Sequence, residues 1–306
     1  MTQQQTMSNA AWAQLFLLGL IWGGSFFSIA IALREIGFLT SVVHRVGWAA
    51  LVLIAVVAIR RHALPRGWQV WVGFLGMGLL NNVIPFTLMA WGQTQIETGL
   101  VSILNAATAI FGVLAAALFL RDERLTVPRG IGTVLGFAGV ATIIGWSALA
   151  SFDIRSIAQL AVIGGTISYA LAGVWARVML KGLPPEVAAA GMLSASFVVM
   201  LPLAWAVEGP PSLALQPATW GAIGYYAIVA TAGAYLLYYR ILAIAGSGNL
   251  LLVTLVIPAV AISLGAAFLG ESLPASAFAG LALIAAGLIV IDGRVHRALF
   301  KRTASG

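Results

Sequence analysis

Long apolar runs, each of about 20 residues, recur along the whole sequence and are separated by short polar stretches. A helix of this length crosses the hydrocarbon core of a bilayer. Prolines mark several of the connections, as expected where helices end. The pattern predicts an all-α polytopic membrane protein with ten spans, over residues 11–33, 41–59, 69–92, 97–120, 128–146, 158–180, 185–207, 219–240, 248–269 and 275–292.

The composition supports a membrane protein and argues against an enzyme. Of 306 residues, 61% are hydrophobic and only 8% are charged, whereas a soluble domain carries about 25% charged residues. The chain has no cysteine and three widely separated histidines. It contains no phosphate-binding loop, metal-ligand spacing or nucleophile motif. We therefore expect no catalytic residues, no metal and no cofactor.

The basic residues predict the orientation of the chain. They lie scattered between apolar runs and form no basic face, which excludes nucleic acid as a partner. With the N-terminus in the cytoplasm, the outer segments hold only Arg34, Arg45 and Arg155. The inner segments then hold Arg60, Arg61, Arg66, Arg121, Arg124, Arg129, Arg177, Lys181, Arg240, Arg294, Arg297, Lys301 and Arg302. This bias predicts both termini in the cytoplasm and a location in the cell (inner) membrane. The first basic residue is Arg34, so the charged start of a signal peptide is missing.

The two halves of the sequence resemble each other. Residues 99–120 align with residues 248–269, and both stretches end in Phe-Leu followed closely by a glutamate, Glu123 or Glu271. Each half has five spans, so the second half must enter the membrane from the opposite side. We expect one repeat over residues 1–147 and a second over 148–306, which ends in a short basic cytoplasmic tail. Two inverted five-helix repeats around a central cavity are typical of secondary transporters.

Several short motifs carry a resemblance to a known family. They are Trp22-Gly23-Gly24-Ser25, Arg45 followed by Ala49-Ala50-Leu51, and the Glu-x-Leu elements at Glu123 and Glu271. In this order, over essentially the whole chain, they resemble the EamA branch of the drug/metabolite transporter superfamily. Within it the chain is most similar to YddG-type amino-acid exporters. The resemblance implies a bundle around a central cavity, cytoplasmic termini and export of amino acids or related metabolites.

Polar and aromatic residues at mid-depth are the candidates for solute binding, because such groups are costly in hydrocarbon unless they pair or face water. They are Trp22, Ser25, Asn81, Asn82, Pro85, Asn105, Thr108, Tyr169, Trp175, Tyr235, Tyr238, Thr254 and Pro258. Pro85 is expected to free the carbonyl of Asn81, and Pro258 that of Thr254; freed carbonyls suit an ammonium group. Two alternatives stay open: the prolines only kink the bundle, and the hydroxyls bond their own helices.

Four further residues are candidates for gating or coupling: His44, Arg45, Glu123 and Glu271. His44 and Arg45 are expected near the outer end of the second span, and the two glutamates at span ends. The alternatives are a satisfied interfacial histidine and carboxylates that cap helices. Since every acidic residue falls near a span end, the cavity should be almost uncharged, which favours a zwitterion or an uncharged aromatic solute without an obligatory ion.

The leading hypothesis is a secondary transporter that exports amino acids, aromatic ones included, or similar small metabolites. Its partners would be that solute and the bilayer. Gly132, Gly139, Gly280 and Gly287 should allow close helix contact, within a monomer or a weak homodimer. The alternatives are a passive channel, a transporter of another metabolite or drug class, and a membrane scaffold or lipid-handling enzyme.

Overall fold

The structure is a computed structural model that describes residues 8–121, 123, 125–145, 153–250 and 253–292, apart from the side chains of 245–249 and 292. Part of the predicted basic tail, from residue 293 onward, lies outside the described residues, as do Asp122 and Arg124. Within the described residues every regular element is helical. This confirms the predicted all-α class.

The first half of the chain forms α1 (Asn9–Ala32), α2 (Phe38–Ile59), α3 (Trp68–Gly78), the π-helix η1 (Leu79–Val83), α4 (Ile84–Gln93), α5 (Thr98–Asn105), α6 (Thr108–Phe119) and α7 (Val127–Ile144). The second half forms α9 (Ile154–Met179), α10 (Pro185–Glu208), α11 (Pro217–Gly224), the π-helix η2 (Tyr225–Gly233), α12 (Ala234–Leu250), α13 (Val253–Leu264), the π-helix η3 (Gly265–Leu269) and α14 (Ala275–Asp292).

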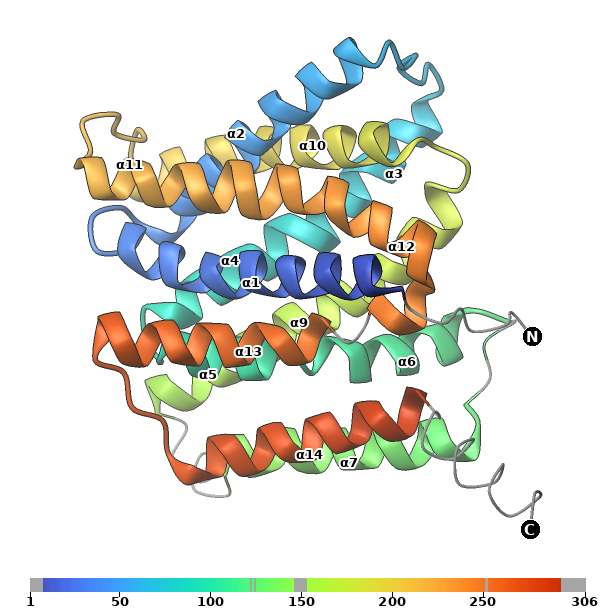
Figure 1. Ribbon diagram of the computed structural model, residues 1–306. Helices are drawn as coiled ribbons and strands as arrows, with labels where there is room; N and C mark the ends of the chain where they lie inside the picture. The colour runs from blue at the N-terminus through green and yellow to red at the C-terminus, as the bar shows by residue number, and fades with distance from the viewer. Residues whose placement is uncertain (1–7, 122, 124, 146–152, 251–252, 293–306) are drawn as a thin grey trace.

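Eight of these helical stretches are long and apolar enough to cross a membrane. Two shorter apolar helices, Val253–Leu269 and Ala275–Ile291, occupy the places of the predicted ninth and tenth spans. The first of them begins directly after residues 251–252, which the structure does not describe. In Figure 1 the start of α1 and the end of α14 lie on the same side of the bundle, as an even number of spans requires.

Helix contacts repeat between the two halves. The first span of each half packs against the fourth span of the other half: α1 contacts α13, and α9 contacts α5 and α6. The third spans behave alike: α3 and α4 contact α9, whereas α11, η2 and α12 contact α1. The contacts of α2 with α10 and of α7 with α14 pair equivalent spans of the two halves. This exchange of equivalent partners is the arrangement expected of two repeats.

Glycines bring α7 and α14 into backbone contact, as predicted. A Cβ atom added at Gly139 would lie 2.7 Å from the carbonyl oxygen of Gly280, and one added at Gly287 would lie 2.5 Å from that of Gly132. Backbones this close exclude any larger residue. The two helices lie side by side as a pair at one edge of the bundle (Figure 1).

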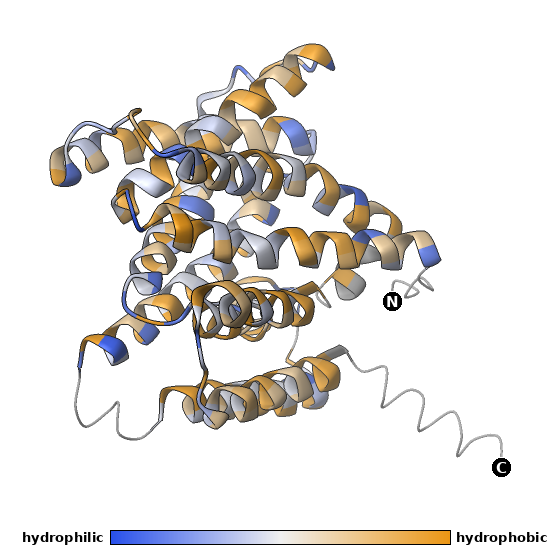
Figure 2. Ribbon diagram, turned by 60° about the vertical axis from the view of Figure 1, so that its left-hand side comes forward, coloured by the Kyte–Doolittle hydropathy of each residue, from blue (hydrophilic) through white to orange (hydrophobic). Residues whose placement is uncertain are grey.

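The helices are hydrophobic along most of their length, and hydrophilic residues gather mainly near their ends (Figure 2). Large side chains such as Leu51, Leu118 and Val198 are exposed. Water would not tolerate so much contiguous apolar surface, whereas lipid does.

Two ends of the bundle are distinguished by their charges. The acidic end carries Glu35, Glu97, Asp153, Glu208 and Glu271, and the basic end carries Arg60, Arg61, Arg66, Arg121, Arg129, Arg177, Lys181 and Arg240. At the acidic end, carboxylates accept hydrogen bonds from N-termini of distant helices. Glu208 accepts from the amides of Leu39 (3.0 Å) and Thr40 (2.8 Å) in α2. Glu271 accepts from those of Thr98 (2.8 Å) and Gly99 (3.1 Å) in α5.

The start of the eighth span is held in the same way, since Glu35 accepts from the backbone amide of Gln216 and the hydroxyl of Thr219. At the sixth span the capping residue is local: Asp153 accepts from the amide of Ser156 at 2.8 Å. Hydrogen bonds from Ser156 lower the pKa of the Asp153 carboxyl. Unpaired amides and the helix dipole both favour a carboxylate at these positions. Hydrogen bonds between spans therefore hold helix ends together at the acidic end.

Candidate solute site

Tyr235 of α12 and two asparagines of η1 form a hydrogen-bonded cluster inside the bundle. The amide nitrogen of Asn81 donates to the Tyr235 hydroxyl at 2.9 Å, and this hydroxyl donates to the amide oxygen of Asn82 at 3.2 Å. The amide nitrogen of Asn82 donates to the hydroxyl of Ser196 in α10 at 3.0 Å. Asn82 is fully buried and Asn81 is partly accessible. Asn81 and Asn82 thus both contact Tyr235, and both also reach α10, since the amide nitrogen of Asn81 lies 3.9 Å from the sulfur of Met192. The cluster joins third spans of both repeats.

Pro85 explains why the third span widens at this point. It lacks an N–H, and the chain before it forms η1, in which the amide of Ile84 bonds to the carbonyl of Leu79, five residues earlier. In this register the carbonyl that Pro85 leaves without a donor belongs to Leu80, and not to Asn81 as predicted from regular helix geometry. The hydroxyl of Ser168 in α9 donates to this Leu80 oxygen at 2.7 Å. The carbonyl freed in this register is therefore already bonded to α9, and the binding of an ammonium group by the Asn81 carbonyl stays a prediction.

A second π-helix, η2, widens the eighth span at the equivalent place and positions Thr231. The Thr231 hydroxyl donates to the carbonyl of Tyr226, five residues earlier, at 2.7 Å. The same hydroxyl accepts a hydrogen bond from Nε of Arg45 at 3.0 Å. The guanidinium carbon of Arg45 lies 3.7 Å from the centre of the Phe86 ring. Arg45 was expected near the outer end of its span, and the structure places it between the third spans of both repeats.

Aromatic rings enclose this part of the bundle. Phe86 meets Tyr169 of α9 edge to face, with ring centres 6.4 Å apart. On another side, the indole N–H of Trp22 donates to the carbonyl of Ala230 in η2 at 3.2 Å, and its ring lies 5.9 Å from that of Tyr238. Trp22, Tyr169 and Tyr238 thus lie around the η1–η2 region, and their binding of a solute stays a prediction.

Other predicted residues have local or peripheral contacts. The Ser25 hydroxyl bonds its own helix at the carbonyl of Trp22 (2.6 Å), which is the alternative left open for such residues. Trp175 donates to the carbonyl of Gly73 at 3.0 Å, toward the basic end. Asn105 ends α5, and Thr108, which begins α6, donates to its amide oxygen at 3.4 Å. These contacts do not connect to Tyr235.

The ninth span contributes Thr254 and Pro258, both in α13. Pro258 is buried and lies inside a regular α-helical stretch, so no π-helix precedes it as η1 precedes Pro85. Pro85 and Pro258 therefore differ in the helix geometry that surrounds them. α13 packs against α1 and α5.

The candidates for gating occupy three different settings. Nδ1 of His44 accepts from the indole of Trp48 at 3.2 Å, and Nε2 is buried without a hydrogen-bond partner in the described structure. Glu271 caps α5, as described above. Glu123 lies at the basic end and pairs with Arg129 at 2.8 Å and with Arg177 at 3.3 Å. The two glutamates therefore hold helix ends together on opposite ends of the bundle.

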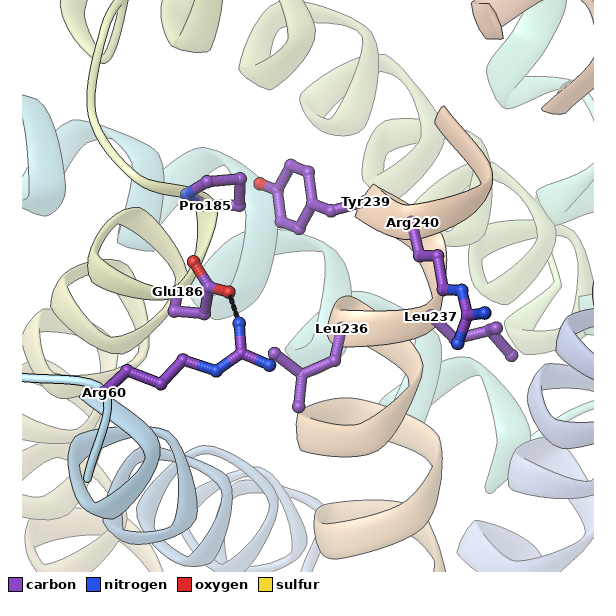
Figure 3. A pocket seen from close by; sticks show the side chains of 7 residues that line it. All are labelled: Arg60, Pro185, Glu186, Leu236, Leu237, Tyr239 and Arg240. Carbon is purple, nitrogen blue, oxygen red and sulfur yellow. Dashed lines mark hydrogen bonds and ion pairs between the residues drawn. The ribbon is translucent and has the colours of Figure 1, made fainter. Parts of the chain in front are cut away.

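A pocket of about 530 Å³ opens at the basic end. Figure 3 shows the ion pair of Arg60 with Glu186 on one side and α12 residues on the other. The residues that line it are Arg60, Pro185, Glu186, Leu236, Leu237, Tyr239 and Arg240. Leu236 directly follows Tyr235 in the chain, but Tyr235 and the two asparagines do not line this pocket.

The site candidates from sequence omitted Ser196, Ser168, Thr231 and Phe86. The two serines and Thr231 bond carbonyls of helices, as most hydroxyls in membrane spans do, and nothing in the sequence separates them from other hydroxyls. Phe86 could have been found from its repeat partner, because the alignment of the two halves places it opposite Tyr235.

Comparison with known proteins gives a family and a fold. The sequence profile of the EamA-like transporter family matches residues 10–145 and again residues 156–292. A solved crystal structure that is 20% identical in sequence has a TM-score of 0.65, over 92% of this chain and 97% of the other.

Among curated relatives, an uncharacterized transporter, YwfM of Bacillus subtilis, is 28% identical over 81% of each chain. A "Probable terminal-alkyne amino-acid exporter" of Streptantibioticus cattleyicolor is 27% identical, over 94% of this chain and 95% of its own. An uncharacterized transporter of Archaeoglobus fulgidus is 24% identical over 92% of this chain and 98% of its own.

Proposed function

Since the chain belongs to the EamA-like transporter family, we propose that it exports amino acids, aromatic ones included, or similar small metabolites by alternating access. One observation carries this proposal: the hydrogen-bonded cluster of Tyr235, Asn81 and Asn82 inside the bundle, between third spans of the two repeats. Transporters built from repeats bind solutes at such an interface, near the middle of the membrane.

The choice of amino acids rests on chemistry and on one relative. Hydroxyl and amide groups beside the aromatic rings of Phe86 and Tyr169 suit a small solute with polar and apolar parts. The relative from Streptantibioticus cattleyicolor is named as an amino-acid exporter. For this chain, aromatic and branched neutral amino acids are the proposed substrates.

Alternating access is supported by the difference between the two ends of the bundle. Carboxylate caps join spans at the acidic end, whereas a pocket opens at the basic end. We take this conformation as the one open toward the basic end. The repeats supply the alternative, because an exchange of their conformations would close this end and open the other.

The distribution of charge supports a location in the inner membrane with the basic end in the cytoplasm. The natural absence of cysteine allows a clean test. Single cysteines at the exposed Asp153 and Leu213 should react with an impermeant maleimide added outside intact cells, and cysteines at the exposed Arg61 and Lys181 should not. The opposite pattern would contradict the orientation.

The function is tested with purified protein in liposomes. Vesicles preloaded with unlabelled L-phenylalanine or L-leucine should accumulate the labelled amino acid faster than empty vesicles, because a carrier exchanges internal for external solute. Uptake that does not saturate and ignores the internal solute would instead indicate a passive pore. No uptake of any neutral amino acid would reject the proposed substrate class.

A further inference from the structure

We propose that Arg45 binds the carboxylate of the transported solute, so that the protein carries carboxylate-bearing molecules and rejects amines and amides of the same shape. This inference rests on the proposed function in one respect, that the cluster around Tyr235 lies on the solute path. It adds a charge to a site for which the sequence predicted almost none, and it assigns the solute a defined chemical group.

Arg45 lies well inside its helix. It follows Phe38, where α2 begins, by seven residues, which is roughly 10 Å along the helix axis at about 1.5 Å per residue. Phe86 and Thr231, from third spans of the two repeats, both contact it. Phe86 follows Asn82 by four residues in the third span and meets Tyr169 edge to face. The guanidinium therefore adjoins the part of the third span that carries the hydrogen-bonded cluster.

Arg45 has no acidic partner among the described residues. The other arginines that form ion pairs in the described part of the chain meet carboxylates at helix ends: Arg60 with Glu186, Arg129 and Arg177 with Glu123, and Arg155 with Glu97. No carboxylate among the described residues pairs with Arg45. A buried charge without a partner is strongly destabilising. The Phe86 ring and the Thr231 hydroxyl offset part of this cost, and neither is an anion.

Most N–H donors of the Arg45 guanidinium are left to bind an anion. A guanidinium has five N–H groups, and the described structure engages only the one on Nε. Phe86 covers one face of the group, which leaves the edge formed by the two terminal nitrogens. This edge matches the two oxygens of a carboxylate, with two parallel charge-assisted hydrogen bonds. Arg45 also retains some accessible surface.

The same charge sets the specificity. An amine without a carboxylate would be repelled by Arg45, and among the described residues every acidic side chain that could attract it lies at a helix end. A neutral amide would leave the guanidinium without its counter-ion. A zwitterion or a carboxylate offers the anion that the site lacks, and the neighbouring rings of Phe86 and Tyr169 accept an apolar side chain.

The test compares matched acids and amides on the whole protein in nanodiscs. Phenylacetate should raise the melting temperature, and phenylacetamide should not. In Arg45→Gln the apparent affinity for phenylacetate should fall by at least about tenfold, because charge-assisted hydrogen bonds are lost. Arg45→Lys, which keeps the charge, should retain a preference for the acid. Arg155→Gln, an arginine of the acidic end that pairs with Glu97, should behave as the unaltered protein does.

Melting without any ligand separates binding from a structural role. If Arg45 has no counter-ion until the solute binds, Arg45→Gln removes an uncompensated charge. The ligand-free variant should then melt at the same temperature as the unaltered protein or at a higher one. If Arg45 only holds helices together, the empty variant should melt lower, and this would overturn the proposal. Equal stabilisation of the unaltered protein by phenylacetate and phenylacetamide would overturn it as well, whether or not the variant folds.

Counterflow distinguishes this inference from the proposed function. L-Phenylalanine should exchange, and L-phenylalaninamide and phenylethylamine should not. If carboxylates stabilise the protein through Arg45 while no amino acid exchanges, the carboxylate site stands and the proposed amino-acid export fails. If L-phenylalanine and its amide exchange equally well, and Arg45→Gln changes neither, export stands and the role of Arg45 is rejected.

Discussion

The hydroxyl of Tyr235 joins the two asparagines of the candidate site to the eighth span. It accepts from Asn81 and donates to Asn82, and Asn82 in turn reaches Ser196. Three spans are thereby joined by neutral hydrogen bonds. In a low-dielectric interior each bond is worth more than in water, and a group left without its partner is costly. Small changes here should therefore affect both transport and stability.

Tyr235→Phe removes this hydroxyl and keeps the ring. We expect counterflow of L-phenylalanine to fall about tenfold, because the amides of Asn81 and Asn82 lose the partner that orients them. The free energy of unfolding should fall by about 1–3 kcal/mol, the cost of unsatisfied buried polar groups. The matched control is Tyr225→Phe on the same span, whose hydroxyl donates to the carbonyl of Ile21 at 3.1 Å. A similar loss of flux in both variants would show that packing, and not the site, explains the effect.

Sequence reasoning identified part of this site and failed at specific residues. Asn81, Asn82 and Tyr235 stand out because amides and a phenol are expensive at the middle of a span. Arg45 was placed too far from them, because counting along one helix says nothing about which neighbouring helices reach its side chain. Trp175 was expected at depth, whereas its indole bonds to Gly73 in the first helix of the third span. These differences come from tertiary contacts.

At the scale of the elements, the π-helices were the least predictable feature. Pro85 predicts an interruption of regular helix geometry in the third span, and the π-helix η1 lies directly before it. η2 contains no proline within Tyr225–Gly233, so its widened turns are set by contacts such as the Trp22 bond to the Ala230 carbonyl. π-helices often occur at functional sites. Here they direct Asn81, Asn82 and Thr231 toward partners on other spans.

The glycine contacts between α7 and α14 allow a test of packing. Gly139→Ala adds a methyl group beside the carbonyl of Gly280, and the helices must separate. We expect the free energy of unfolding to fall by about 1–3 kcal/mol, as for other overpacked sites. Gly130→Ala, on the same helix with nothing within 4 Å of the added atom, should be neutral or stabilising. Thermal melting in detergent measures both, and equal melting temperatures would contradict the close contact.

The carboxylate caps of the acidic end allow a second test. Glu271→Gln removes a charge that accepts two backbone hydrogen bonds at the start of α5. The loss should be about 0.5–2 kcal/mol, the usual worth of a helix cap. Glu97→Gln is the control, because Glu97 pairs at 2.6 Å with Arg155, which is 41% exposed, and exposed pairs contribute little. Equal destabilisation by the two changes would argue against a special role for the cap.

At the scale of the whole molecule, the sequence predicted the fold class and the two repeats well. Spans follow from apolar length alone, and most predicted boundaries lie within about three residues of the helices, as at Phe38–Ile59 and Pro185–Glu208. The predicted tenth span, 275–292, coincides with α14, whereas residues 248–250, predicted to begin the ninth span, instead end α12. Hydropathy predicts the approximate length of a span. The register of a helix against its neighbours depends on side-chain packing, which a single sequence does not reveal.

The distribution of acidic residues leads to a prediction about coupling. Carriers driven by protons or sodium usually keep an ionisable group deep in the membrane, where it changes partners between states. In the described part of the chain every acidic residue lies at a helix end: Glu35, Glu97, Glu123, Asp153, Glu186, Glu208 and Glu271. The deep charge belongs to Arg45, and it is positive. We therefore expect facilitated exchange of zwitterions without an obligatory ion.

Liposomes with an imposed gradient measure this directly. Initial uptake of labelled L-phenylalanine should be the same with and without a pH or sodium gradient, and a membrane potential should have little effect because the zwitterion carries no net charge. Export would then follow the higher concentration of amino acid inside a producing cell. Concentrative uptake that an ionophore abolishes would contradict this prediction. In that case His44, whose Nε2 is buried without a partner in the described structure, is the first residue to change, and loss of proton-driven uptake in His44→Gln would identify it as the coupling group.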